Sequence, residues 1–365
     1  MSGLSLPLLL LIFAAAAAAI WVAGIQLSNQ TDVLSVRLHL GSALGGLILL
    51  AVATNLPEIA IVVTASLSGN VGVAVGNILG GIAIQTVVLV VLDAAGVRGK
   101  RPLTYQAASL VLVLEAALVV AVLAVVVAGS QLPANLIFLR LTPGPVLITI
   151  LWVAGLFLLR RAGRSLPWHE SGQAPDGQDR PRGHKTRHTE HVATTKGTST
   201  TKAALVFAGA AVVTLIAGVV LERSGDAIAD HIGLSGVLFG STVLAAATSL
   251  PEVSTGITSV RNGDYQLAVS DIFGGNAFLP VLFLAATLLS GKAVLAQAQN
   301  TDIYLTALAM LLTLVYAAGL LFRPRRRTLR PRRRRPGRPG RVLLRRRPER
   351  PCGAPVRQDP QLTCP

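Results

Sequence analysis

Two stretches of the sequence place a carboxylate, hydroxyl groups and a proline together inside otherwise apolar runs. They read ATNLPEIAIVVTASLSG (53–69) and ATSLPEVSTGITSVRNG (247–263). In each stretch a glutamate follows two adjacent polar residues at distances of three and four positions. This spacing puts the three side chains on one face of a helix. These side chains are Thr54, Asn55 and Glu58 in the first stretch, and Thr248, Ser249 and Glu252 in the second.

A proline precedes the glutamate in both stretches. Because proline has no N–H, Pro57 frees the carbonyl of Ala53 and Pro251 frees the carbonyl of Ala247. Backbone groups freed within an apolar segment must be satisfied by protein, water or a ligand. Carboxylate, hydroxyl, amide and carbonyl oxygens together suit Ca²⁺, Na⁺ or a proton-exchanging carboxylate, and they do not suit soft metals.

The elements that carry these residues are predicted to be membrane helices. The chain has 365 residues, of which 52% are hydrophobic. It contains several apolar runs of about 20 residues, long enough to cross a hydrocarbon core of about 30 Å. We therefore expect an all-α polytopic membrane protein rather than a soluble domain. The nine expected spans lie near 5–27, 36–67, 70–95, 106–129, 142–159, 203–221, 233–260, 265–290 and 303–322.

Polar segments lie between and after these spans. Segment 160–202 is rich in Gly, Arg, His and Thr and is predicted to be a solvated linker. The tail, 323–365, is predicted to be disordered, and its Arg/Pro-rich run cannot span a membrane. This run either binds anionic lipid headgroups or is an altered C-terminus that replaces a missing helix. Both cysteines, Cys352 and Cys364, lie in this tail, so no disulfide framework or thiolate metal site is expected.

The formal net charge of +16 comes mainly from the tail, which holds 16 Arg against two acidic residues. The rest of the chain is close to neutral and offers no electrostatic support for nucleic-acid binding. The other Lys and Arg residues set the orientation, because they are enriched in cytoplasmic loops. Their distribution predicts a multi-pass protein of the cell membrane, with its N-terminus outside and its linker and tail in the cytoplasm.

The two motif-bearing stretches belong to an internal duplication. With a constant offset of 194 positions, residues 53–88 pair with 247–282 without gaps, and 14 of the 36 pairs are identical. The predicted topology makes the second copy inverted in the membrane. Inverted repeats with broken helices that meet near the midplane are typical of alternating-access transporters.

The helix after each motif carries a further polar residue. Asn77 and Asp271 both stand 19 positions after the motif glutamate, in GNVGVAVGNILGGIAIQ and GDYQLAVSDIFGGNAFL. Close helix packing explains the glycines of these helices but not the two polar side chains.

The acidic residues within the predicted spans lack basic partners nearby in their own spans. An ionised acid at the bilayer centre costs roughly 2.5–3.5 kcal/mol or more. We therefore expect these acids, Glu58, Glu115, Glu252 and Asp271, to be protonated or neutralised by a bound cation. Switching between the two states is what a cation antiporter does.

The motifs ATNLPE…GNILGG and ATSLPE…SDIFGGNAF resemble the two α-repeats of the calcium/cation antiporter superfamily, which includes the sodium/calcium exchangers. The resemblance implies five plus five helices, of which we expect five plus four here, with Pro-broken helices at the midplane. It implies no cofactor. It further implies that Ca²⁺ and Na⁺ bind the six motif side chains listed above and backbone oxygens from about Ala51 and Ala245.

The partner helices depart from the family pattern G-N-x-x-G-S-N-x-x-N. Gly81 and Gly275 stand where the family has Ser. The closing Asn or Asp is Gln85 in the first repeat and Leu279 in the second. Asp271 lies eight residues before Leu279, about 12 Å along a helix, so it is not the same ligand unless the register shifts.

These observations predict a transporter rather than an enzyme: a cation antiporter that exchanges Ca²⁺ for Na⁺ or H⁺ by alternating access. A monovalent Na⁺(K⁺)/H⁺ exchanger on the same fold is the main alternative. An intramembrane carboxylate enzyme and a non-transporting membrane scaffold are further alternatives, although neither motif has a histidine near its glutamate. The expected organisation is a first half at 1–159 with its repeat at about 40–92, a linker at 160–202, a second half at 203–322 with its repeat at about 234–290, and a tail at 323–365.

Overall fold

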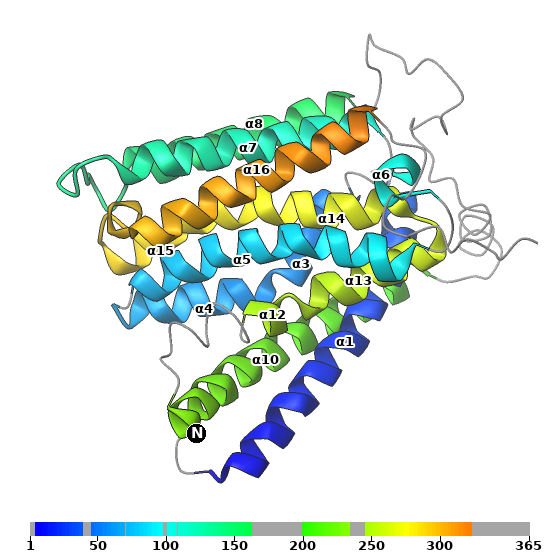
Figure 1. The fold of residues 1–365 in the computed structure, drawn as a ribbon, viewed down its shortest axis with the longest axis horizontal. Coiled ribbons are helices and arrows are strands. Elements are labelled where there is room, and N and C mark those ends of the chain that lie inside the picture. Colours follow the sequence, from blue (N-terminus) through cyan, green and yellow to red (C-terminus); the bar gives the residue numbers. More distant parts are fainter. Residues whose placement is uncertain are drawn as a thin grey trace, which may run out of the picture. The chain divides into compact units, whose positions relative to one another are not determined.

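The described part of the chain is helical. A computed structural model describes residues 4–38, 45–69, 71–97, 101–107, 109–162, 199–233 and 245–322 (Figure 1). Within these ranges the only bridge of β type is an isolated one between Phe138 and Leu141. Seven of the described helices are long and apolar enough to cross a membrane, or eight if one bent pair counts as a single span. The prediction of an all-α, multi-pass membrane protein is confirmed.

The first half of the chain contains five long segments in order. The first is α1 (Leu6–Arg37), and the second is a broken helix made of η1 (Gly45–Leu50), α3 (Ala51–Thr54) and α4 (Leu56–Leu67). The third is α5 (Val71–Val91), which continues as η2 (Leu92–Gly96). After the short α6 (Leu103–Gln106), the last two are α7 (Leu110–Ser130) and α8 (Pro143–Ala162).

The second half contains four long segments within its described residues. They are α10 (Thr200–Ile232), a broken helix made of α12 (Ala245–Thr248) and α13 (Leu250–Asn262), then α14 (Tyr265–Phe278) with η4 (Leu279–Val281) and α15 (Leu282–Ser290), and α16 (Asn300–Phe322), which the short η5 (Leu295–Gln297) precedes.

These segments overlap all nine expected spans, although α12 and α13 together are not among the helices apolar enough to span by themselves. Helices α8 and α10 extend into both ends of the expected linker, to Ala162 and from Thr200. The rest of that linker, 163–198, and the tail, 323–365, lie outside the described residues.

The duplication found in the sequence reappears in the helix boundaries. The offset of 194 carries α3 (51–54) onto α12 (245–248) and carries the first residue of α4 onto the first residue of α13. It also carries α1 onto α10 with an end that differs by one residue. The repeats differ in the helix that follows the break. Helix α14, the counterpart of α5, already ends at Phe278 and continues as η4, because Pro280 has no N–H to donate to the helical hydrogen bonds.

The two broken helices run in opposite directions. The end of α4 lies beside the start of α5, where the Lys292 side chain donates to the carbonyl of Gly69 at 3.3 Å. Gly256, at the middle of α13, instead packs on Leu92, which follows the end of α5. Since α5 runs from one end of the bundle to the other, α4 and α13 point to opposite ends, as the inverted repeat requires.

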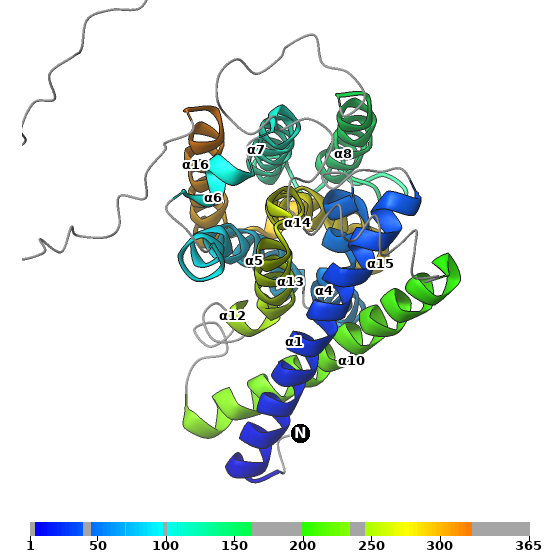
Figure 2. The ribbon, with the colours of Figure 1, turned by 90° about the vertical axis from the view of Figure 1, so that its right-hand side faces the viewer.

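Three groups of helices make up the bundle. Helices α1 and α10 pack along each other on one side, and α7, α8 and α16 lie on the opposite side (Figures 1 and 2). The broken helices, α5 and α14 lie between these groups. Each of α1 and α10 has more than 30 residues, which is close to 50 Å of helix. Both therefore exceed the hydrocarbon thickness and must tilt or project from it.

Helices α1 and α10 each pack against the proline turn of the other repeat. A Cβ atom on Gly218 of α10 would lie 2.5 Å from Cβ of Pro57, and a Cβ atom on Gly24 of α1 would lie 3.3 Å from the carbonyl oxygen of Pro251. Gly24 and Gly218 are themselves 194 positions apart. The two repeats therefore pack closely against each other's helix breaks, through the Pro57 ring at Gly218 and through the Ser254 side chain and the Pro251 carbonyl at Gly24.

We predict that Gly218→Ala destabilises the protein by about 1–3 kcal/mol, because the new methyl group overlaps the Pro57 turn. Gly209→Ala is the matched control on the same helix, since a Cβ atom there meets nothing within 4 Å. Thermal unfolding of the detergent-purified full chain measures both. An equal effect of the two substitutions would show that the contact with Pro57 is not tight.

Candidate cation site

Each broken helix places its glutamate in the first turn of a new helix. The chain bends by 54° between the segments that end at Thr54 and begin at Leu56. Pro57 and Pro251 occupy the first turns of α4 and α13, where a helix tolerates a missing N–H. Glu58 and Glu252 lie in the same first turns, and the positive end of a helix dipole favours a carboxylate there.

The motif side chains are buried in the middle of the bundle. All six of them are at most 3% exposed: Thr54, Asn55, Glu58, Thr248, Ser249 and Glu252. The breaks also meet the two central helices, because Asn55 contacts the position of Gly275 on α14 and Glu252 contacts Gln85 on α5. The structure thus brings the two sequence motifs, nearly 200 residues apart in the chain, into one buried cluster.

The first repeat contributes a hydrogen-bonded pair of amides to this cluster. The Nδ2 group of Asn55 donates to the carbonyl of Ala51 at 2.6 Å. The Nε2 group of Gln85 donates to Oδ1 of Asn55 at 2.9 Å and to Oε1 of Glu252 at 3.2 Å. Gln85 therefore links the broken helices of both repeats.

Asp271 is also part of the cluster, and it is fully buried. Its Oδ1 accepts a hydrogen bond from the Thr54 hydroxyl at 3.2 Å, and its Oδ2 accepts one from the Thr255 hydroxyl at 2.6 Å. Sequence reasoning did not select Thr255. The available signal was its position three residues after Glu252, which places it on the same helix face.

The carboxyl group of each motif glutamate lies near the motif threonine of the other repeat. The Thr248 hydroxyl lies near the Glu58 carboxyl group, and the Thr54 hydroxyl lies near the Glu252 carboxyl group. Glu58 and Glu252 also interact electrostatically with each other, and Glu252 does so with Asp271. Glu252 therefore lies close enough to both other acids to be affected by their charge.

Several buried oxygens of the cluster have no hydrogen-bond donor in the described structure. They are both carboxylate oxygens of Glu58, Oε2 of Glu252 and Oε1 of Gln85. Every one of these atoms can accept a hydrogen bond or bind a cation, and none can donate while the carboxylates are ionised. Buried acceptors of this kind are costly unless a proton or a cation satisfies them.

The remaining expected ligands are Asn77 and the backbone of Ala245. Asn77 is partly buried, with its Nδ2 atom 3.5 Å from the backbone carbonyl of Glu58. Ala245 begins α12 and is the counterpart of Ala51. Leu279 is fully buried, and its Cδ1 atom lies 3.8 Å from the position of a Cβ atom on Gly81. The second repeat thus places an apolar side chain where the first places Gln85.

The acidic side chains do not form a compact metal site by themselves. Among the residues that the structure describes, no three His, Cys, Asp or Glu side chains converge tightly enough to hold one metal ion. A cation between Glu58 and Glu252 must therefore draw on hydroxyl and carbonyl oxygens as well, as Ca²⁺ and Na⁺ sites commonly do.

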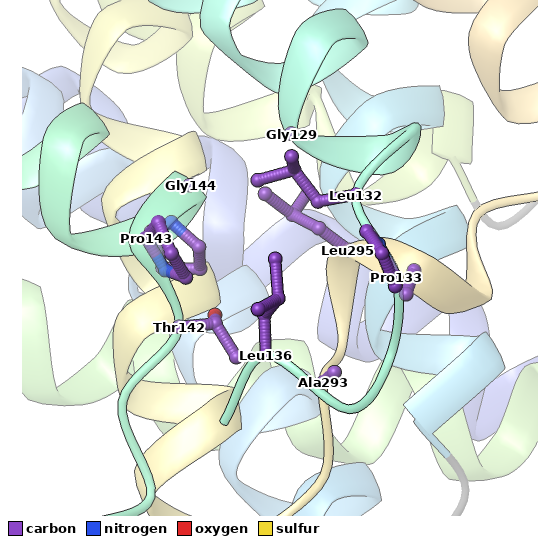
Figure 3. Close-up of a pocket in the computed structure, with 11 residues that line it drawn as sticks. Gly129, Leu132, Pro133, Leu136, Thr142, Pro143, Gly144, Ala293 and Leu295 are labelled. Carbon is purple, nitrogen blue, oxygen red and sulfur yellow. The ribbon is translucent and has the colours of Figure 1, made fainter. Parts of the chain in front are cut away.

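A surface pocket lies apart from these acids. It is formed by the connection between α7 and α8 and by residues 293–296, and its lining is made of glycine, alanine, proline and leucine with one hydroxyl, that of Thr142 (Figure 3). Because the lining contains no acid or amide, this pocket does not supply the ligands of a cation site.

Glu115 is a further buried acid, on α7. It is fully buried, and neither of its carboxylate oxygens accepts a hydrogen bond from the part of the chain that the structure describes. Its carboxyl group interacts with Ser270 of α14. Glu115 has no acidic counterpart in the second repeat.

Comparison with known proteins agrees with this arrangement. A family model described as "Sodium/calcium exchanger protein" matches residues 8–161 and 202–342. The inner membrane protein YrbG of Escherichia coli is 28% identical over 246 residues, and the match covers 66% of each chain. The putative antiporter CaxA of Alkalimonas amylolytica is 32% identical over 101 residues, which is 27% of this chain and 32% of that protein. These matches span less than two thirds of the relatives' own lengths.

The fold is also that of a solved exchanger. The structure of the sodium-calcium exchanger NCX_Mj, soaked with Na⁺ and Sr²⁺, superposes with a TM-score of 0.59. The match covers 87% of this chain and 92% of that chain, at 14% sequence identity. The broken helices, central helices and long outer helices described above are therefore arranged as in that fold.

We predict that Thr255→Val destabilises the protein by about 1–3 kcal/mol, because it leaves a buried Asp271 oxygen without its donor. Thr258→Val is the matched control: its hydroxyl donates to the Ser254 carbonyl of its own helix. Thermal unfolding of both variants in cation-free buffer checks this prediction. A loss at Thr258 as large as that at Thr255 would contradict a special role for the bond to Asp271.

Proposed function

Because the chain belongs to the sodium/calcium exchanger protein family, we propose that it is an antiporter that exchanges Ca²⁺ for Na⁺ or H⁺ across the membrane by alternating access. The site is formed by Glu58, Glu252, Thr54, Thr248 and the carbonyls of Ala51 and Ala245. Five further side chains line it: Asn55, Ser249, Asn77, Gln85 and Asp271.

One observation carries this proposal. The glutamates of two inverted repeats meet in the centre of the bundle, and three of their four carboxylate oxygens have no donor in the described structure. A hard cation satisfies such oxygens without adding bulk. The oxygen-only donor set supports an alkali or alkaline-earth cation over a transition metal.

The same arrangement supports coupled exchange. With no cation or proton bound, the cluster would hold uncompensated negative charge at membrane depth, which is costly. Movement of the site from one side to the other is therefore favoured when the charge is neutralised. After it releases one cation, the site can then return only when it carries another cation or a proton. Coupling of this kind is antiport.

The orientation and organisation follow as part of this proposal. The N-terminus is outside, the linker at 160–202 and the tail at 323–365 are cytoplasmic, and the halves at 1–159 and 203–322 are the two moving units. The close contacts at Gly24 and Gly218 join α1 and α10 to the broken helices of the opposite repeat.

A monovalent Na⁺(K⁺)/H⁺ exchanger is the second candidate. It is favoured by Leu279, which takes the place of an oxygen ligand in the second repeat. It is also favoured by the Gln85 N–H group that faces Glu252, because a donor at this point lowers the negative potential that a divalent cation needs.

Transport by proteoliposomes tests the proposal. We expect ⁴⁵Ca²⁺ uptake driven by an imposed Na⁺ or H⁺ gradient, and we expect Glu58→Gln and Glu252→Gln each to reduce it at least tenfold, since each removes a charged ligand. Glu252→Gln should be at least as damaging as Asp271→Asn, because the glutamate lies in the helix break.

Glu115→Gln is the control for the loss of a buried acid outside the site, and it should leave more activity than either motif variant. Unchanged uptake in both motif variants would refute the proposed site. Na⁺/H⁺ exchange without Ca²⁺ uptake would instead establish the monovalent candidate.

A further inference from the structure

The two motif glutamates occupy equivalent positions in the repeats but have different neighbours. Glu252 accepts a hydrogen bond from Nε2 of Gln85 at 3.2 Å. Glu58 has no donor for either of its carboxylate oxygens in the described structure. The duplication would predict equal surroundings, so the difference must come from residues that have diverged between the repeats.

The divergent residue is the one 27 positions after each glutamate. It is Gln85 in the first repeat and Leu279 in the second, and both side chains are fully buried. Gln85 reaches across to the glutamate of the other repeat. Leu279 packs toward Gly81 instead and offers no polar atom.

The amide of Gln85 is held in one orientation. Its nitrogen lies between two acceptors, Oδ1 of Asn55 at 2.9 Å and Oε1 of Glu252 at 3.2 Å. Asn55 is itself anchored by its bond to the Ala51 carbonyl at 2.6 Å. An amide turned around would place its oxygen against these two oxygens, so the N–H face is the one that meets Glu252.

Space for this amide pair comes from a missing side chain on α14. A Cβ atom at Gly275 would lie 2.6 Å from Nδ2 of Asn55 and 3.2 Å from Oε1 of Gln85. The counterpart of Asn55 is the smaller Ser249. Asn55, Gln85 and Gly275 thus form one unit on a single side of the glutamate pair.

We propose that Gln85, held by Asn55, competes with the transported cation for Glu252 and so lowers the affinity of the site, which leaves Glu58 as the carboxylate that mainly binds the cation. This inference rests on the proposed antiport function. A cation that takes Oε1 of Glu252 must displace a hydrogen bond to a charged group, and the loss of that bond offsets part of the binding energy. A weaker site also releases its cation more readily after each crossing.

The opposite role for Gln85 gives the opposite result. If its Oε1 atom were a cation ligand, removal of the side chain would weaken binding. If Gln85 competes with the cation, removal strengthens binding. The sign of the change therefore separates the two roles.

The experiment uses variants that exchange residues between the repeats. Gln85→Leu copies Leu279 with little change in volume, Asn55→Ser copies Ser249 and removes the anchor of Gln85, and Leu279→Gln introduces a donor beside Glu58. Isothermal titration of the detergent-purified full chain with CaCl₂ and, separately, with NaCl gives the dissociation constants. The rise in melting temperature with cation concentration provides a second measure that does not depend on transport.

We expect Gln85→Leu to bind the cation about tenfold more tightly than the unaltered chain, with a smaller gain for Asn55→Ser and weaker binding for Leu279→Gln. Unchanged or weaker binding in both Gln85→Leu and Asn55→Ser would overturn the inference. Asn55→Ser decides if Gln85→Leu does not fold, as judged by its elution volume.

The unaltered chain separates the two levels of the argument. If it binds neither Ca²⁺ nor Na⁺, the proposed function fails and the inference fails with it. If it binds one of them and the variants bind equally well, only the role of Gln85 is refuted.

Discussion

The structure depends on two glutamates that are buried within a bundle of apolar helices and have no basic partner among the described residues. Charge at membrane depth is costly unless a proton, a cation or a donor compensates it. The helix breaks before Glu58 and Glu252 compensate part of this charge, because they place each carboxylate at the positive end of a new helix. The rest must come from a proton or a bound cation, which is why we propose a cation site at the centre of the molecule.

The surrounding helices can be understood from the same constraint. Breaks in the middle of a membrane helix need close neighbours, because the freed backbone groups cannot be left facing lipid. Gly218 and Gly24 allow α10 and α1 to lie against the proline turns of the opposite repeat. Helices α5 and α14 enclose the breaks with residues such as Gln85 and Asp271. Duplication supplies both halves of this enclosure, and inversion lets each half cover the other.

Most of the fold could be predicted because its signals are local and repeated. Apolar runs identified the long helices, and the offset of 194 positions anticipated that α12 and α13 would copy α3 and α4. Helix ends were less predictable. Helices α1 and α10 extend several residues beyond their apolar cores, since a helix can continue into water as long as its backbone bonds are satisfied. The role of Thr255 was missed because a hydroxyl in a helix has many other uses.

The sequence by itself determined the membrane fold, the inverted duplication and the identity of the two central acids, because periodicity, proline positions and internal identity are properties of the chain alone. Only the tertiary structure decided which of those acids already accepts a hydrogen bond. Gln85 meets Glu252 across 167 positions of sequence, and Thr54 meets Asp271 across 217. Such pairings depend on how two distant repeats pack. A hydrogen bond depends on distance in space, which spacing along the chain does not specify.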